Sequence, residues 1–234
     1  MDPATTGFFF WDPTMILLIP ALILGFWAQS KVKSAFAKYS KVKAASGMTG
    51  AQAARYLLDR AGLEEIAIEP VQGHLSDHYD PRKKVLRLSE GVYGSPSLAA
   101  LGVAAHEAGH ALQDKEGYWP MSIRHGLVPV ANLGSSMLFP LLIGGFFFGI
   151  KPLITIGIVL YSFAVAFHLV TLPVEFNASS RALKVLEGSG ALHPDEIGGA
   201  RKVLSAAAMT YVAATLTAVL TLVRLLILRN MGDD

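Results

Sequence analysis

Four long apolar runs are the main constraint on how this chain folds. They cover residues 8–28, 127–149, 153–172 and 205–228. A helix of about 20 apolar residues crosses the roughly 30 Å core of a bilayer. The composition agrees, since 52% of the residues are hydrophobic and only 16% are charged. We therefore predict a mainly α membrane protein with about four transmembrane helices.

The basic residues are distributed unevenly between these runs. Residues 30–126 and 173–204 hold 17 of the 20 Lys and Arg residues. Loops rich in Lys and Arg remain on the cytoplasmic side of the membrane. We therefore predict that the N-terminus lies outside and that both segments are cytoplasmic. A signal peptide explains the first run less well, because Asp2 and Asp12 stand where basic residues are expected.

The runs divide the chain into five predicted segments. Residues 1–29 form the first transmembrane helix, and residues 30–126 form a small cytoplasmic α+β module. Residues 127–172 hold transmembrane helices 2 and 3. Residues 173–204 form a cytoplasmic helical segment, and residues 205–234 contain the fourth transmembrane helix and the C-terminus.

Turn and capping residues predict the elements of the module. Thr49 is expected to cap a helix over residues 49–61. Two β-like segments follow at 65–71 and 84–89, and turn residues fill 73–81 between them. We expect a short β-hairpin or sheet, in which 84–89 is an edge strand, the kind of strand that can hold an extended peptide by its backbone.

The turn segment carries four residues of metal-binding type, which are His74, Asp77, His78 and Asp80. One interpretation is a second metal cluster. The interpretation that we prefer is that these side chains shape a turn near the active site. The chain has no cysteine, so any metal ligand must be His, Glu or Asp.

The sequence AAHEAGHALQ at residues 104–113 contains the pattern H-E-x-x-H. In a helix, His106 and His110 share one face with Cβ atoms about 5–6 Å apart, which lets both imidazoles reach one zinc ion. Glu107 is then placed to act on a water molecule as a general base. Gly109 weakens the helix, and we expect it to make room for another backbone.

Glu175 is the third zinc ligand that we select. It is predicted to begin a helix just inside the membrane surface, where a carboxylate is costly without a partner. Ser179 lies four residues later on the same helical face and is a candidate for orienting a ligand. The alternative is that Glu175 is an ordinary interfacial charge.

The motifs AAHEAGHALQ, GHLSDHYDP and LPVEFNASSRAL together resemble the YugP-type neutral zinc metallopeptidases of bacterial membranes. The family is more distantly similar to HtpX and the CAAX prenyl proteases, which carry H-E-x-x-H and a later E-x-x-x-D. Glu175 matches the Glu of that pattern, whereas Ser179 occupies the position of the Asp. The resemblance implies a zinc-dependent endopeptidase of the gluzincin type in the bacterial cytoplasmic membrane, with its active site at the cytoplasmic face.

The expected reaction is peptide hydrolysis by a zinc-activated water, with Glu107 as general base. A further donor should stabilise the tetrahedral oxyanion. The candidates for that role are His125, His168, Arg181 and Tyr211. Packing within the helix bundle is the alternative for His168 and Tyr211, and a solvated charge is the alternative for Arg181.

The expected partners are a peptide or protein substrate, including membrane proteins, and the lipid bilayer. A net charge of only +2 gives no case for nucleic-acid binding. The main alternative function is a zinc-binding membrane scaffold or assembly factor without proteolytic activity. An intramembrane protease of the site-2 type fits less well, because the charged residues Asp114, Lys115 and Glu116 follow directly after the H-E-x-x-H segment. A transporter is the least favoured, since the spans lack charged pathway residues.

Overall fold

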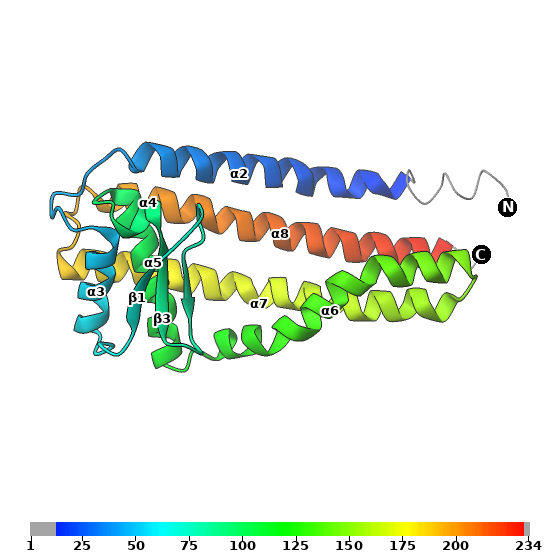
Figure 1. Cartoon of the computed structure of the whole chain (residues 1–234). Helices are drawn as coiled ribbons and strands as arrows, with labels where there is room; N and C mark the ends of the chain where they lie inside the picture. The colour runs from blue at the N-terminus through cyan, green and yellow to red at the C-terminus, as the bar shows by residue number, and fades with distance from the viewer. Residues whose placement is uncertain (1–12, 232–234) are drawn as a thin grey trace. The chain divides into compact units, whose positions relative to one another are not determined.

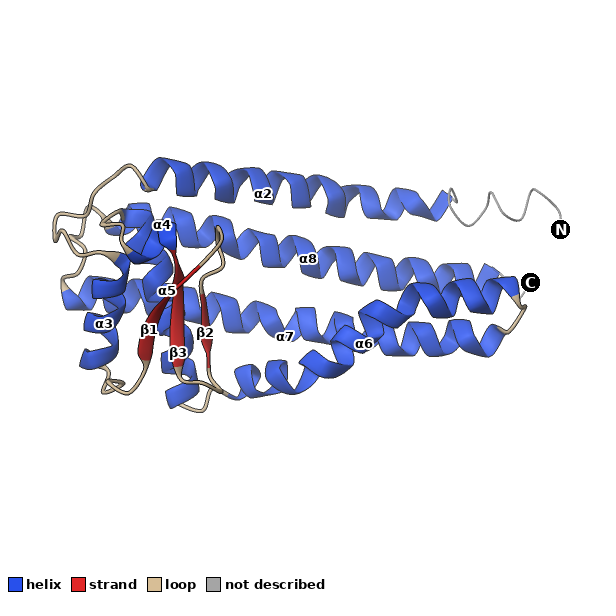
Figure 2. Ribbon diagram, viewed as in Figure 1, coloured by secondary structure: helices blue, strands red, loops and turns tan. Residues whose placement is uncertain are grey.

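The computed structural model describes residues 13–231, which form two compact units. The unit called here the membrane unit takes the described residues of Met1–Trp27, Ile123–Leu172 and Tyr211–Asp234. The site unit takes Ala28–Ser122 and Pro173–Thr210. Figure 1 traces the chain through both units, and Figure 2 shows that helices dominate them.

Four helical segments are long and apolar enough to cross a membrane. The first, Pro13–Tyr39, consists of a short 3₁₀ helix, η1 (Pro13–Leu18), and α2 (Ile19–Tyr39). The others are α6 (Trp119–Phe147), α7 (Lys151–Ser189) and α8 (Ile197–Met231). By length and composition they confirm the predicted fold class. Residues 8–12 of the first predicted run, and the acidic residues Asp2 and Asp12, lie outside the described residues.

The helices are longer than the predicted spans. We expected Glu175 to begin a helix, but it lies inside α7, which continues through Pro173 and is 39 residues long. The proline removes one helical hydrogen bond, to the carbonyl of Leu169, and a long apolar helix tolerates that loss. At 1.5 Å per residue α7 is about 58 Å long, nearly twice the bilayer core. One helix therefore supplies residues to both units.

The membrane unit is held together by close helix packing. A Cβ atom on Gly134 would lie 2.1 Å from the carbonyl oxygen of Leu160, so α6 and α7 approach each other backbone to backbone. Arg124 and His125, which precede the apolar run 127–149, lie inside α6. The Thr215 hydroxyl of α8 donates to the carbonyl of His168 in α7.

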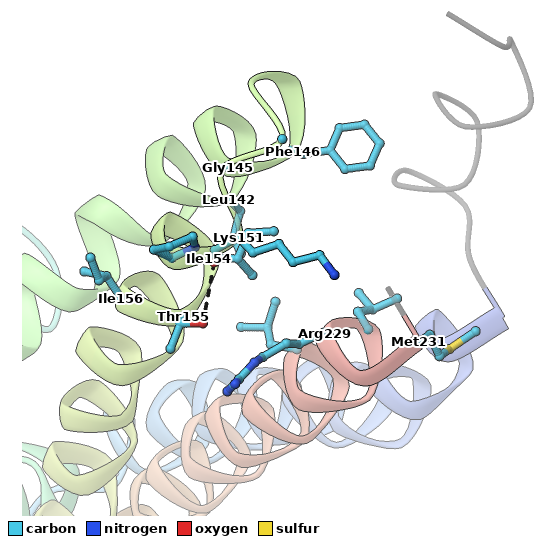
Figure 3. Close-up of a pocket in the computed structure, with 13 residues that line it drawn as sticks. Leu142, Gly145, Phe146, Lys151, Ile154, Thr155, Ile156, Arg229 and Met231 are labelled. Carbon is cyan, nitrogen blue, oxygen red and sulfur yellow. Dashed lines mark hydrogen bonds between the residues drawn. The ribbon is translucent and has the colours of Figure 1, made fainter. Parts of the chain in front are cut away.

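A cavity of about 840 Å³ lies in the membrane unit, where α6, α7 and α8 end or begin (Figure 3). Its lining is apolar except for Lys151, Thr155 and Arg229. None of the residues of the H-E-x-x-H motif lines this cavity, because they all belong to the site unit.

The site unit begins with α3 (Gly50–Arg60), which the sequence predicted closely. The Thr49 side chain accepts a hydrogen bond from the backbone N–H of Gln52, and the Gln52 side chain accepts one from the N–H of Thr49. This reciprocal capping box satisfies two N–H groups that the first turn leaves unpaired. Gly62 follows with a positive φ of 65°, which only glycine adopts without strain.

The sheet contains three strands, β1 (Ala67–Val71), β2 (His78–Asp80) and β3 (Val85–Ser89), in the order β1-β3-β2. β1 runs parallel to β3, and β2 is antiparallel to it. Our prediction that 84–89 is an edge strand was therefore wrong, because β3 lies in the centre (Figure 2). Four of its five residues are buried, as expected for a strand covered on both faces.

The segment 73–81, which was predicted as a turn, contains β2. This strand has only three residues, which is too short for a periodic pattern to reveal. The acidic residues of the segment accept hydrogen bonds from two different places, Asp77 from the end of β3 and Asp80 from the turn that follows β2. The Asp77 carboxylate accepts from the N–H and hydroxyl of Ser89 at 2.7 and 3.0 Å. Asp80 accepts from the backbone N–H groups of Arg82 and Lys83. Within residues 13–231, these side chains form no metal cluster.

Two helices follow the sheet, α4 (Glu90–Tyr93) and α5 (Leu98–Lys115). Ser97 caps α5 by accepting from the N–H of Ala100. Thirteen of the 18 residues of α5 are buried, which places this helix in the core of the site unit. The H-E-x-x-H motif therefore lies on a helix that is largely buried.

Candidate metal centre

The two motif histidines lie one turn apart on α5. Their ring centroids are 4.8 Å apart, with the rings nearly perpendicular. Both side chains are largely buried, and Glu107 between them is buried as well. The helix is rich in alanine and leucine, so a four-residue spacing places both imidazoles on one face.

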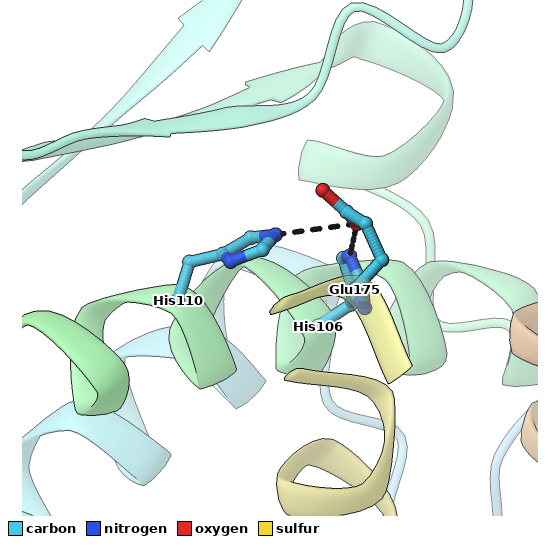
Figure 4. A group of neighbouring side chains, drawn as sticks. All are labelled: His106, His110 and Glu175. Carbon is cyan, nitrogen blue, oxygen red and sulfur yellow. Dashed lines mark hydrogen bonds and ion pairs between the residues drawn. The ribbon is translucent and has the colours of Figure 1, made fainter. Parts of the chain in front are cut away.

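Glu175 reaches these histidines from the middle of α7. Its carboxylate oxygen Oε2 lies 3.2 Å from Nε2 of His106 and 3.6 Å from Nε2 of His110 (Figure 4). The residues are 69 positions apart in sequence, and the packing of α7 on α5 brings them together. Only 2% of Glu175 is exposed, so its charge is buried with the imidazoles as its partners.

The separations fit a zinc site. Two ligand atoms at about 2.0–2.1 Å from a tetrahedral zinc are about 3.4 Å apart, and the two Nε2–Oε2 distances bracket that value. His106, His110 and Glu175 form the candidate metal cluster of the described residues, with their ligand atoms all within 4.8 Å of one another. Two imidazoles and one carboxylate are a donor set that zinc commonly takes in catalytic sites.

The electrostatics of the cluster favour a cation. Burial by itself lowers the pKa of His110, but the neighbouring carboxylates of Glu175 and Glu107 outweigh it, and the pKa is raised. Two buried carboxylates beside two imidazoles therefore attract positive charge. A divalent metal ion meets that requirement with a fixed geometry.

Each histidine has an oxygen partner at its other ring nitrogen. The hydroxyl of Ser179 lies 3.1 Å from Nδ1 of His106. The amide oxygen of Gln113 lies 3.0 Å from Nδ1 of His110. Zinc-bound histidines commonly make such a bond, which fixes the ring orientation and tautomer. The sequence singled out Ser179 for this role.

Gln113 was missed by the sequence analysis. It is fully buried, and its amide nitrogen donates to the carbonyl of Val174 and to the side chain of Asn177, both on α7. The available signal was its place three residues after His110 on the same face of α5. Spacing alone does not reveal which polar residue faces an imidazole.

The remaining candidates are not part of the cluster. Arg181 pairs with Glu116 at 2.7 Å and donates to Asn177 at 2.6 Å. This ion pair lowers the pKa of Glu116. His125, His168 and Tyr211 belong to the membrane unit. A role for any of these four residues at the oxyanion stays a prediction.

Comparison with known proteins also points to a zinc site. A family model described as "Putative neutral zinc metallopeptidase" matches residues 14–230. The protein named "Putative membrane protease YugP" of Bacillus subtilis (strain 168) is 51% identical over 220 residues, which cover 94% of this chain and 98% of that protein. No solved structure matches the chain. Because the family model spans nearly the whole sequence, the chain belongs to this family of neutral zinc metallopeptidases.

Proposed function

We propose that the chain is a membrane-embedded zinc endopeptidase of the gluzincin type, which hydrolyses peptide bonds in peptide or protein substrates. The observation that carries the proposal is the meeting of His106, His110 and Glu175 at distances that suit one zinc ion. Three protein ligands leave a fourth position for water or substrate, as catalytic zinc sites require.

The residues of α5 and α7 have three roles in the proposed reaction, which are metal binding, proton transfer and orientation of the imidazoles. His106, His110 and Glu175 hold the metal, and zinc supplies water activation and polarisation of the scissile carbonyl. Glu107, which is buried next to His106, accepts the proton of the attacking water and passes it to the leaving amine. Ser179 and Gln113 keep the two imidazoles in their orientations.

The outer edge of β2 is the place that we assign to an extended substrate. β2 pairs with β3 on one side only, whereas β3 is paired on both sides. The Tyr79 hydroxyl of β2 donates to Asp114 of α5 at 2.8 Å, which ties this strand to the helix that carries the motif. A peptide that adds to an edge strand gains backbone hydrogen bonds without sequence preference.

The charge distribution supports a location for this site. Residues 30–126 and 173–204, which include all three metal-binding candidates, hold 17 of the 20 Lys and Arg residues. By the positive-inside rule we infer a multi-pass protein of the bacterial cytoplasmic membrane, with the N-terminus outside and the active site at the cytoplasmic face. Substrates are then cytoplasmic chains or the cytoplasmic parts of membrane proteins.

The decisive experiment uses the full chain, purified in detergent and loaded with zinc. We expect it to cleave unstructured casein, to lose this activity with a zinc chelator, and to regain it when zinc is added. Glu107→Gln should bind zinc as the wild type does and lose hydrolysis by a factor of at least about 100. Wild-type activity in Glu107→Gln would show that Glu107 is not the base.

The same assay separates the alternatives. A wild-type protein that binds one zinc ion and cleaves neither casein nor membrane-protein substrates would favour the zinc-binding scaffold. Cleavage restricted to transmembrane helices would favour an intramembrane protease. Chelator-sensitive cleavage of casein supports the endopeptidase against both.

A further inference from the structure

We propose that the cavity of the membrane unit binds one anionic phospholipid of the surrounding bilayer, with the lipid phosphate beside Lys151 and Arg229 and an acyl chain inside. None of the metal-binding candidates lines this cavity, so the inference does not depend on the proposed reaction. Three observations carry it, which are the depth of the cavity, the order of charged and apolar residues along its walls, and the charge of the unit.

The cavity begins at the ends of three helices and extends inward along them. Lys151 is the first residue of α7, and Arg229 lies two residues before the end of α8. At 1.5 Å per residue, the lining residue Leu142 lies about 8 Å from the end of α6, and Leu225 lies about 9 Å from the end of α8. The deepest lining residue of each helix is apolar, with Ile156 in that place on α7. The two cations therefore lie at the outer end of the cavity, and its inner end is apolar.

This arrangement matches a phospholipid, which keeps its phosphate at the membrane surface and its acyl chains in the hydrocarbon core. The volume of about 840 Å³ lies within the range of about 300–1,000 Å³ that is typical of small-molecule sites. A buried water molecule needs about two to four polar partners, which the apolar inner walls do not supply. An acyl chain is therefore a better occupant of the inner part than water.

The charge of the membrane unit favours an anionic headgroup. Its described residues contain no Asp or Glu and four Lys and Arg residues, which are Arg124, Lys151, Arg224 and Arg229. Two of these four line the cavity. Figure 3 shows both side chains at the cavity, Lys151 from the start of α7 and Arg229 from the last turn of α8. Ammonium and guanidinium groups are the usual partners of phosphate oxygens in proteins.

The surface beside the cavity indicates that the ligand comes from the bilayer. Four large apolar side chains are exposed within five consecutive residues at the end of α6 and in the turn to α7, namely Phe146, Phe147, Phe148 and Ile150. An exposed apolar patch of this kind marks a contact with a protein or a membrane. Since it joins two candidate membrane spans, we assign it to lipid and the cavity to a membrane phospholipid.

The test measures lipid binding to the full chain in detergent by native mass spectrometry. Dioleoylphosphatidylglycerol is the anionic probe, and dioleoylphosphatidylcholine is a zwitterionic probe with the same chains. Lys151→Gln combined with Arg229→Gln removes both charges from the cavity. Arg82→Gln combined with Lys83→Gln is the matched control, because it changes the net charge equally at exposed positions of the site unit.

A second pair of variants tests the apolar part of the cavity and keeps every charge. Leu228→Trp places an indole ring in the cavity, which Leu228 lines. Leu226→Trp makes the same change two residues earlier on α8, at an exposed position outside the lining. A difference between these two variants therefore reports on the cavity itself.

We expect the wild type to bind one molecule of the anionic probe, and to bind the zwitterionic probe more weakly. Each cation near an anionic lipid contributes about 5-fold in affinity. Loss of both cations should therefore weaken binding of the anionic probe by about 25-fold and leave the zwitterionic probe nearly unchanged. Leu228→Trp should weaken both probes, whereas the two control variants should match the wild type.

Equal affinities of the wild type for the two probes would overturn the inference, as would equal losses in the two charge variants. Wild-type affinity in Leu228→Trp would place the lipid elsewhere on the helices. A wild type that retains no lipid would mean that other residues of the chain fill the cavity, and tighter binding of oleate would assign the cavity to a fatty acid. Either result overturns the phospholipid as occupant. If circular dichroism shows that the lysine–arginine variant is unfolded, the two probes on the wild type and the tryptophan pair still decide the question.

Discussion

A Cβ atom placed on Gly109 would lie 2.7 Å from the carbonyl oxygen of Ala178, closer than Cβ atoms come to other atoms in real structures. Helices α5 and α7 therefore meet backbone to backbone at this point. Gly109 directly precedes His110, and Ala178 directly precedes Ser179. This contact brings the carboxylate of Glu175 to the histidines, and it explains a glycine that costs α5 about 1 kcal/mol relative to alanine.

We expect Gly109→Ala to weaken zinc binding by about 10-fold or more, although alanine favours the helix. The added methyl group must push α7 away from α5, and overpacking of this kind costs about 1–3 kcal/mol. Glu175 moves with α7, so the ligand distances lengthen. Gly198→Ala is the matched control, because a Cβ on Gly198 of α8 meets nothing within 4 Å. Equal zinc affinities in the two variants would show that the α5–α7 contact does not position the ligands.

Glu175→Ala should abolish stoichiometric zinc binding. The substitution removes the only carboxylate of the candidate cluster. The two imidazoles that remain are too few ligands for a tight zinc site. Metal analysis of the purified protein measures the effect. Glu187→Ala, at an exposed position on the same helix, should keep one zinc per chain. Full zinc content in Glu175→Ala would remove this residue from the ligand set.

Ser179→Ala should lower zinc affinity by about 10-fold and leave the fold intact. The hydroxyl at 3.1 Å from Nδ1 is the partner that orients the His106 ring. Removing it lets the ring rotate and leaves a buried nitrogen without its partner. Chelator competition and circular dichroism on the same samples separate the loss of affinity from unfolding. A variant that binds zinc as tightly as the wild type would show that packing alone holds His106.

Zinc should raise the thermal unfolding temperature of the wild-type protein. A ligand that binds only the folded state at 100 times its dissociation constant stabilises that state by about 2.7 kcal/mol. His110→Ala should show no such rise, because it removes one of the three candidate ligands. Scans with and without added zinc after chelator treatment make the comparison, and an equal rise in both proteins would indicate zinc binding elsewhere.

Tyr79→Phe should destabilise the protein by about 1 kcal/mol near neutral pH, since it removes the hydrogen bond to Asp114. Burial, and then the hydrogen bond to Asp114, raise the pKa of Tyr79. The folded state thus prefers the neutral phenol, so its contribution is complete below the unfolded pKa of about 10 and is lost as the pH rises above that value. Denaturant unfolding should give a higher free energy of unfolding for the wild type than for Tyr79→Phe at pH 8, and a smaller difference at pH 11. A constant difference across this range would exclude the titration of Tyr79 as its cause.

Local features of this chain were predictable because near neighbours in sequence encode them. Apolar runs of sufficient length predicted the four candidate spans. Thr49 predicted the N-terminal end of α3. The spacing of His106 and His110 predicted two imidazoles on one helical face. Each of these features depends on residues that are close in sequence. They lie within about one helical turn for the cap and the motif, and within about 20 residues for a span.

The tertiary structure alone decided how these pieces combine. The central position of β3 depends on a three-residue strand whose register no periodic pattern reveals. The role of Gln113 depends on Val174 and Asn177, which are 61 and 64 residues away. The sequence by itself determined which side chains can bind a metal, because ligand chemistry belongs to residue type. Their meeting required the close approach of α5 and α7, since atoms far apart along a chain are brought within bonding distance only by packing.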